Sequence, residues 1–241
     1  FYSLKDMLSG KDCSKVRGLW WEEEGEIKSN PRAANITDLS GELSEVAWDL
    51  LPMGENKYRA FNWTCLGDLN SRNRFVSLFT SLGCPFHCNF CAIHATYGER
   101  KLRCWNPEWV LNQFDLLVNK YNVKNINLHD ELFIFKHSHY HPIAEGILKR
   151  RYDLNIVSFA RVDILDKTSV EELTFLKKAG FNWFKLGIES CNEEIIKKNK
   201  KGNFTKDVIR RVVRKVHEVG IDLCANFMFG LPGDTIETMQ E

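Results

Sequence analysis

The chain has 241 residues, with 33 Lys or Arg and 32 Asp or Glu, so its net charge is +1. This length predicts one large domain, or one domain and part of another, and the near-neutral charge argues against nucleic acid or an anionic membrane as a default partner. No run of about 18 apolar residues is present that could span a membrane. Eight cysteines without the framework of a small disulfide-rich domain favour a reducing, cytoplasmic compartment and metal or redox use.

Residues 1–74 are irregular in pattern. Residues 18–30 predict a β-hairpin that turns near Glu24 and Gly25, and residues 38–52 contain a short helical pattern. The segment is too short for a large core of its own, so we expect residues 1–74 to be the tail of an upstream domain and a linker. The chain opens on Phe1 and stops at Glu241 within a helical pattern, which predicts a fragment of a longer protein.

From residue 75 onward, apolar strand patterns alternate with amphipathic helix patterns. The predicted strands are residues 75–82, 123–128, 155–160, 184–188 and 223–229. The predicted helices begin at Asn106-Pro107, Pro142, Ser169 and Val208. This alternation predicts an α/β fold with a parallel sheet, either a barrel or a doubly wound sheet.

Polar side chains follow the first four predicted strands at their carboxyl ends. They are Cys84, then Asp130 and Glu131, then Arg161 and Asp163, then Glu189 and Ser190. Solvated loop charges are the commoner fate of any single one of these residues. Their shared position predicts a site, because active residues of parallel sheets gather at the carboxyl ends of the strands.

Three cysteines stand close together in the run Cys84-Pro85-Phe86-His87-Cys88-Asn89-Phe90-Cys91, a C-x3-C-x2-C spacing. Three thiolates can hold three irons of a 4Fe–4S cluster, which leaves the fourth iron without a protein ligand. An open coordination position is typical of a metal site that does chemistry. A structural zinc site completed by His87 or His94, or a ferredoxin-like cluster completed by Cys104, are the alternatives.

This motif, placed after the first strand of an α/β repeat and with Phe90 before the last cysteine, resembles the signature of the radical S-adenosylmethionine (SAM) superfamily. Four later segments agree with it: residues 126–133 (INLHDELF), 158–163 (SFARVD), 186–190 (LGIES) and 226–235 (NFMFGLPGDT). The resemblance implies a partial (β/α) barrel over residues 75–241, truncated at its C-terminus. Residues 18–52 are similar to the join that follows a cobalamin-binding domain in one subgroup.

The resemblance implies roles for individual residues. Cys84, Cys88 and Cys91 would bind the cluster, and SAM would chelate its open iron. Asp130 or Glu131 would meet the SAM amino group, although His129-Asp130-Glu131 replaces the Gly-Gly-Glu of many members. Arg161 would pair with the SAM carboxylate, and the remaining contacts to SAM would come from Phe90, Glu189, Ser190, Met228 and Gly230.

The implied reaction is reductive cleavage of SAM to methionine and a 5′-deoxyadenosyl radical. With cobalamin, the expected outcome is methyl transfer or rearrangement on a small-molecule or lipid-like substrate, and a flavodoxin or ferredoxin would supply the electron. Two further readings are a methylthiotransferase acting on RNA and a non-catalytic zinc or iron–sulfur module. A separate run, His137, His139 and His141, predicts loop solvation, helix capping or a metal site.

Overall fold

The computed structural model describes residues 2–43, 45–55 and 57–241, and it divides into two compact units, Phe1–Thr37 and Asp38–Glu241. The first unit contains α1 (Tyr2–Leu8), a 3-10 turn η1 (Cys13–Lys15) and an antiparallel hairpin of β1 (Trp20–Glu23) and β2 (Glu26–Ser29). Glu24 and Gly25 both have positive φ, as a two-residue hairpin turn of the favoured hand requires, so the predicted hairpin is confirmed.

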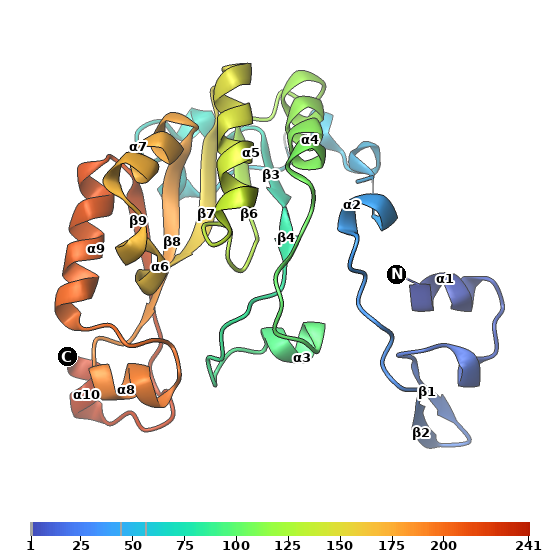
Figure 1. Cartoon of the computed structure of the whole chain (residues 1–241). Helices are drawn as coiled ribbons and strands as arrows, with labels where there is room; N and C mark the ends of the chain where they lie inside the picture. The colour runs from blue at the N-terminus through green and yellow to red at the C-terminus, as the bar shows by residue number, and fades with distance from the viewer. Residues whose placement is uncertain (1, 44, 56) are drawn as a thin grey trace. The chain divides into compact units, whose positions relative to one another are not determined.

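The second unit is built on a five-stranded parallel sheet (Figure 1). Its strands, in spatial order, are β3 (Phe75–Leu78), β6 (Asn125–Leu128), β7 (Asn155–Arg161), β8 (Phe181–Glu189) and β9 (Asp222–Phe227). Spatial order follows chain order without a reversal. A doubly wound sheet reverses at a switch point, so this order decides for the partial barrel. The predicted fold class is confirmed.

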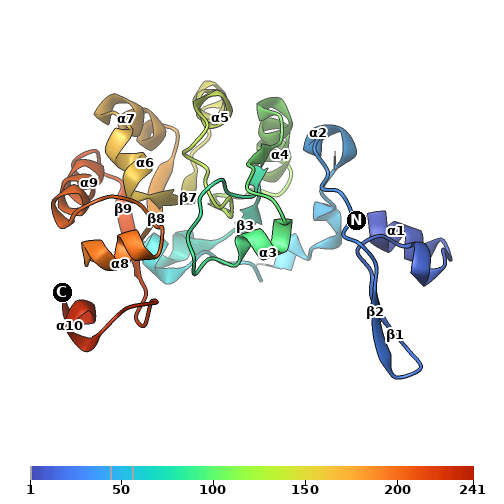
Figure 2. The same ribbon diagram turned by 60° about the horizontal axis from the view of Figure 1, so that its bottom comes forward.

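The long helices cover one face of this sheet, the outer face of the partial barrel (Figure 2). The helices of the unit are α2 (Leu39–Glu42), α3 (Ile93–Tyr97), α4 (Pro107–Asn119), α5 (His137–Arg150), α6 (Val162–Lys167), α7 (Val170–Lys178), α8 (Glu193–Lys198), α9 (Lys206–Glu218) and α10 (Ile236–Gln240). The core between helices and sheet contains fully buried Phe114, Phe133, Phe181 and Phe184. None of the described helices has an apolar stretch long enough to cross a membrane.

Local sequence signals explain several of these boundaries. Asn106 caps α4 by accepting a hydrogen bond from the Glu108 N–H, and Pro107 occupies the first helical position, as predicted.

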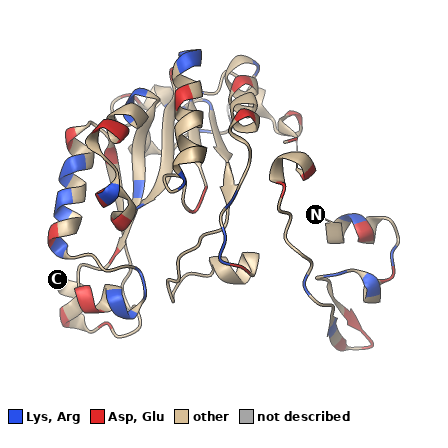
Figure 3. Cartoon of the chain, viewed as in Figure 1, with Lys and Arg blue, Asp and Glu red and all other residues tan. Residues whose placement is uncertain are grey.

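Basic residues collect on α9 (Figure 3), where Arg211 pairs with Asp166 at 2.8 Å and Arg210 with Asp207 at 3.1 Å.

Two predicted elements differ most from the structure. The single strand predicted over residues 75–82 is divided, because the chain leaves the sheet after Leu78 and residues Ser81–Leu82 form β4 in a separate small sheet. The helix predicted to begin at Pro142 begins at His137 instead, so the proline lies inside α5.

Residues just before β3 close the amino-terminal end of the sheet. They include the 3-10 turns η4 (Asn62–Cys65) and η5 (Leu69–Arg72); two further turns, η2 (Trp48–Leu50) and η3 (Met53–Glu55), precede them. Trp63 packs edge-on against Trp183 of β8, with ring centres 5.1 Å apart, and Asn155 of β7 donates a hydrogen bond to the Thr64 carbonyl. Residues 38–74 thus belong to the same compact unit as the sheet. That residues 1–74 continue an upstream domain stays a prediction.

Candidate functional site

The cysteine motif lies in a loop that is closed at its base. β4 (Ser81–Leu82) pairs antiparallel with β5 (Arg103–Cys104), and residues 83–102 form the loop between them. Gly83 opens this loop with φ +91°, and a Cβ there would overlap the Lys101 carbonyl oxygen. A glycine is therefore required where the chain turns from β4 into the cysteine run.

Asp130 fixes the chain just before this loop. Its carboxylate accepts hydrogen bonds from the Thr80 N–H at 2.7 Å, the Thr80 hydroxyl at 2.6 Å and the Ser81 hydroxyl at 2.6 Å. His139 of α5 lies 2.9 Å from the same Thr80 hydroxyl. Complete burial raises the pKa of Asp130 to about 6, although the three hydrogen bonds oppose this shift. The hydrogen bonds of Asp130 thus connect the carboxyl end of β6 to β4 and to the residue before it.

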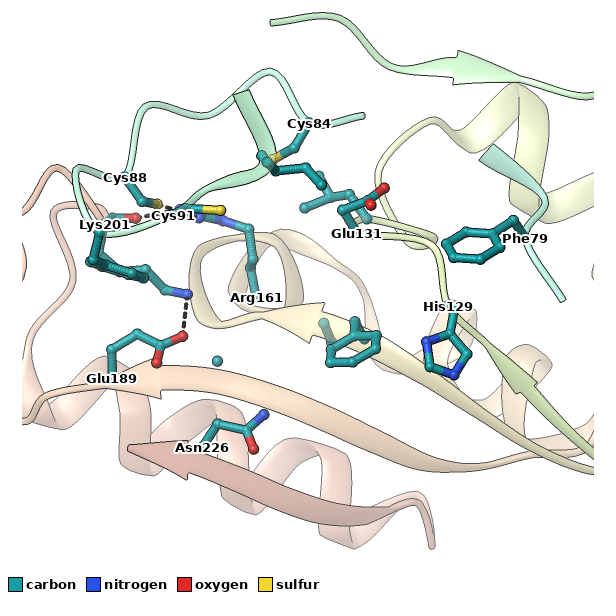
Figure 4. A pocket seen from close by; sticks show the side chains of 16 residues that line it. Phe79, Cys84, Cys88, Cys91, His129, Glu131, Arg161, Glu189, Lys201 and Asn226 are labelled. Atoms are coloured by element: carbon teal, nitrogen blue, oxygen red, sulfur yellow. Dashed lines mark hydrogen bonds and ion pairs between the residues drawn. The ribbon is translucent and has the colours of Figure 1, made fainter. Parts of the chain in front are cut away.

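A cavity of about 440 Å³ opens at the carboxyl ends of the strands (Figure 4). The predicted site residues that line it are Cys84, Cys88, Phe90, Cys91, Glu131, Arg161 and Glu189. Residues from the loop, β6, β7 and β8 therefore meet at one place, as their shared position at strand ends predicted. Asp130 does not line the cavity, so of the two acidic neighbours Glu131 is the one that reaches it.

The three thiols suit a cluster better than a single ion. A tetrahedral ion bound at 2.3 Å would hold its sulfurs about 3.8 Å apart. Within the described residues, Cys84, Cys88 and Cys91 are not among the groups whose ligand atoms all lie within 4.8 Å of one another. A four-iron cube spans a larger distance between its cysteine sulfurs, and an all-thiol donor set is its usual one. The residues present therefore fit a 4Fe–4S cluster.

The fourth ligands considered from the sequence have other positions. His94 uses Nε2 for a hydrogen bond to the Phe86 carbonyl at 2.6 Å. Cys104 lies in β5, and its side chain does not line the cavity. His87 is exposed and also lies outside the lining. This arrangement is consistent with a cluster that keeps one iron open.

Two buried cations stand beside the cysteines. Arg161 forms a fork with Asp163, at 2.9 Å from Nε and 2.8 Å from Nη2, and its Nη1 donates to the Cys88 sulfur at 3.4 Å. Lys201 pairs with Glu189 at 2.9 Å, and this pair lies over Gly187, where a Cβ would come within 2.7 Å of both side chains. Glu189 itself has φ +71°, in the left-handed region, at the end of β8.

The end of the cavity away from the cysteines is lined by His129 and Phe79 (Figure 4), and Phe159, another lining residue, lies beside His129 with ring centres 6.3 Å apart. The ammonium group of Lys185 can only donate a hydrogen bond, so the atom of Asn127 that it contacts at 3.3 Å is the amide oxygen, Oδ1. The amide nitrogen of Asn127 therefore faces His129 Nε2, at 2.5 Å. His129 Nε2 accepts, and the proton of the neutral ring lies on Nδ1. Burial lowers the pKa of His129, and the Lys185 charge lowers it further, which keeps the ring neutral.

The other predicted contacts lie elsewhere. Ser190 and Met228 line a neighbouring cavity of about 240 Å³ that Glu189 also borders, and Gly230 lines neither of these two cavities. The roles assigned to the predicted site residues stay predictions. Sequence reasoning missed His129 and Lys201 as cavity residues. His129 shares the strand-end signal of Asp130, whereas Lys201 follows α8 without any local signal.

The histidine run divides between two places. His139 is buried beside Thr80, and His137 and His141 face Glu172 of α7, with His141 Nδ1 2.9 Å from the carboxylate. In the described part of the chain, only His137, His141 and Glu172 bring three such ligating atoms within 4.8 Å of one another. The two imidazole rings stack with centres 4.4 Å apart and 24° between planes, and His141 also stacks on Phe175 of α7. We read this group as a contact between helices.

The family model of the radical SAM superfamily matches residues 78–241 of the chain. The chain belongs to this superfamily. The radical SAM chain is similar to an uncharacterised methyltransferase of Pyrococcus horikoshii, at 27% identity over all 241 residues, which cover 49% of that relative. It also matches the bacteriochlorophyllide d C-12(1)-methyltransferase of Chlorobaculum tepidum, at 26% identity, over 90% of the chain and 47% of the relative.

Solved structures agree with the fold. OxsB, a cobalamin-dependent SAM radical enzyme with aqua-cobalamin and SAM bound, superimposes with a TM-score of 0.70 at 23% identity, over 99% of this radical SAM chain and 33% of OxsB. The methyltransferase TsrM of Kitasatospora setae, with cobalamin and a [4Fe–4S] cluster bound, gives a TM-score of 0.68 at 18% identity, over 97% and 44% of the two chains. The chain thus spans about half or less of the length of these relatives.

Proposed function

We propose that this chain is the catalytic core of a cobalamin-dependent radical SAM enzyme that transfers a methyl group to, or rearranges, a small-molecule or lipid-like substrate. The observation that carries the proposal is the meeting of three thiols with Glu131, Arg161 and Glu189 in one cavity at the strand ends. When bound, a 4Fe–4S cluster supplies one low-potential electron to the sulfonium of SAM, which splits into methionine and a 5′-deoxyadenosyl radical.

The chain's own residues would bind and orient SAM around that step. Glu131 accepts a hydrogen bond from the Gly83 N–H at 3.1 Å and reaches the cavity beside Cys84, where it suits the SAM amino group. Burial raises the pKa of Glu131, and a bound ammonium group would reverse that shift. Lys201, next to Glu189, is a buried cation suited to the SAM carboxylate, an alternative to the Arg161 contact implied by the sequence.

The substrate would enter at the His129 end, where Phe79 and Phe159 offer aromatic faces. Support for an apolar substrate comes from the names of the relatives, which include a bacteriochlorophyllide methyltransferase, anaerobic magnesium-protoporphyrin IX monomethyl ester cyclases and a hopanoid methylase. Because some of these relatives are named cyclases, ring formation is a second candidate reaction for this chain, beside methyl transfer. The cobalamin, a flavodoxin or ferredoxin reductant, and a reducing cytoplasmic compartment belong to the same proposal.

The test is anaerobic assembly of the cluster, followed by incubation with SAM and a chemical reductant. We expect about four irons per chain and formation of 5′-deoxyadenosine and methionine, measured by mass spectrometry. Cys91→Ala should lose both properties. Cys13→Ala, which removes another exposed thiol, should keep them. Tightly bound zinc without iron, or equal activity in the Cys91→Ala variant, would refute the proposal.

A further inference from the structure

Arg161 contacts the sulfur of one cysteine of the motif from inside the protein. The residue is 6% exposed, and its Nη1 donates to the Cys88 sulfur at 3.4 Å. The guanidinium carbon also lies 3.7 Å from the centre of the Phe86 ring, which belongs to the same loop. Cys88 is buried at 9% exposure, whereas Cys91 is exposed and Cys84 intermediate. The cation therefore meets the most buried of the three thiols.

The hydrogen bonds of Arg161 hold its charge in this position. A guanidinium has five N–H groups. Asp163 accepts two of them in a fork, at 2.9 and 2.8 Å, the Lys201 carbonyl accepts another from Nη2, and the Cys88 sulfur accepts one from Nη1. A second forked grip, on the carboxylate of SAM, would require Arg161 to release Asp163. The geometry thus directs this arginine to the cysteine loop.

A charge and a hydrogen bond at a ligand sulfur affect the reduction of an iron–sulfur cluster. Reduction adds one negative charge to the cluster and its thiolates. A nearby cation and an N–H···S hydrogen bond both stabilise the reduced form, so they raise the potential, and a nearby anion lowers it. Burial keeps the effective dielectric constant low, which strengthens both effects.

We propose that Arg161 raises the reduction potential of the cluster through its contact with Cys88, and that Asp163 acts as the opposing charge. This inference rests on the proposed cluster. Arg161 would thereby determine how readily a cellular electron donor can reduce the cluster. Asp163, with its side chain 24% exposed, would limit the increase.

The experiment compares two variants that each remove one charge of the same ion pair. Arg161→Gln and Asp163→Asn are prepared in the full chain, the cluster is assembled anaerobically, and the midpoint potential is measured without SAM by redox titration with electron paramagnetic resonance. We expect a more negative potential for Arg161→Gln and a less negative one for Asp163→Asn. Arg150→Gln, which breaks a comparable fork with Asp115 on the outer helices, should leave the potential unchanged.

Opposite signs distinguish the proposal from a structural role. Loosening of the loop would move the potentials of both variants in the same direction, and that result, or no shift, would overturn the inference. If Arg161→Gln holds no cluster, Arg161→Lys replaces it. Lysine keeps the positive charge but lacks the planar guanidinium, so we expect the midpoint potential of Arg161→Lys to be more negative than that of the unmodified chain, by less than complete removal of the charge would cause. An unchanged midpoint potential in Arg161→Lys would overturn the inference. Failure of the unmodified chain to assemble a cluster would instead overturn the proposed function.

Discussion

Two adjacent acidic residues have opposite fates in this site. Asp130 points behind the loop, where it is fully buried and accepts hydrogen bonds from Thr80 and Ser81, and Glu131 points into the cavity. Side chains of an extended chain alternate between its two sides, so one residue serves the framework and the next serves the site. The family resemblance implied that either Asp130 or Glu131 would contact SAM, and only their surroundings in the structure separate them.

The buried carboxylate predicts a pH dependence of stability. Burial raises the Asp130 pKa from 3.8 to about 6, so the folded chain binds this proton more tightly than the unfolded chain. The contribution of Asp130 to the free energy of unfolding is therefore most favourable below about pH 4 and is lost as the pH rises through about 6.

Asp130→Asn cannot ionise and should remove this dependence. Relative to the variant, we expect the free energy of unfolding of the wild type to fall by roughly 1–3 kcal/mol between about pH 4 and pH 7. Urea titrations at both pH values measure the difference. A gap between wild type and variant that stays constant with pH would contradict the expectation.

At the scale of elements, the site exists because a strand ends early. The chain leaves the sheet after Leu78, and after two intervening residues β4 pairs with β5, so the cysteine loop starts from a closed base. The loop is also attached at its far side, where Asn89 N–H donates to the Asn199 carbonyl at 3.0 Å. The protein's own hydrogen bonds thereby hold the cysteine run at its base and again between Cys88 and Cys91.

Gly83→Ala tests this base. The added Cβ would meet the Lys101 backbone carbonyl, and φ +91° disfavours any side chain, so we expect a loss of about 1–3 kcal/mol in unfolding free energy and reduced iron content after assembly. Gly67→Ala serves as the matched control, because nothing lies within 4 Å of its Cβ position. Equal stability and iron content in the two variants would show that the turn tolerates a side chain.

At the scale of the whole molecule, the domain that carries the site begins before its first strand. Phe61 packs edge-on against Phe75, Trp63 against Trp183, and Asn125 donates a hydrogen bond to the Ser71 carbonyl at 2.8 Å. These contacts cover the ends of β3, β6 and β8 opposite the cavity. A boundary drawn at Phe75 by the sequence pattern would remove this cover.

Two truncations separate these boundaries. A chain of residues 38–241 should keep the cooperative urea unfolding and iron content of the full chain, because it retains one compact unit. A chain of residues 75–241 should lose several kcal/mol of stability, since removal of a packed aromatic side chain such as Trp63 typically costs about 3–5 kcal/mol. Circular dichroism during urea titration measures the stability of both truncations, and iron analysis after cluster assembly measures their iron content. Equal stability of the two truncations would place the boundary at Phe75.

The sequence alone determined what depends on local rules. The C-x3-C-x2-C spacing identified the thiols, Asn106-Pro107 located the start of α4, Glu24-Gly25 located the hairpin turn, and polar residues after apolar runs identified the edge of the sheet where the cavity lies. Each of these signals acts over a few residues, because caps, turns and strand ends are set by neighbouring backbone groups.

Only the tertiary structure decided which distant groups meet. Arg161 contacts Cys88, which lies 73 positions earlier in the chain, and Lys201, which follows α8, pairs with Glu189. On α5, His139 contacts Thr80, whereas His137 and His141 contact Glu172. The division of the first predicted strand likewise depends on Asp130, 50 positions away. No local pattern encodes such pairings, because they arise when parallel strands bring their carboxyl ends to one edge and burial selects the partners of each charge.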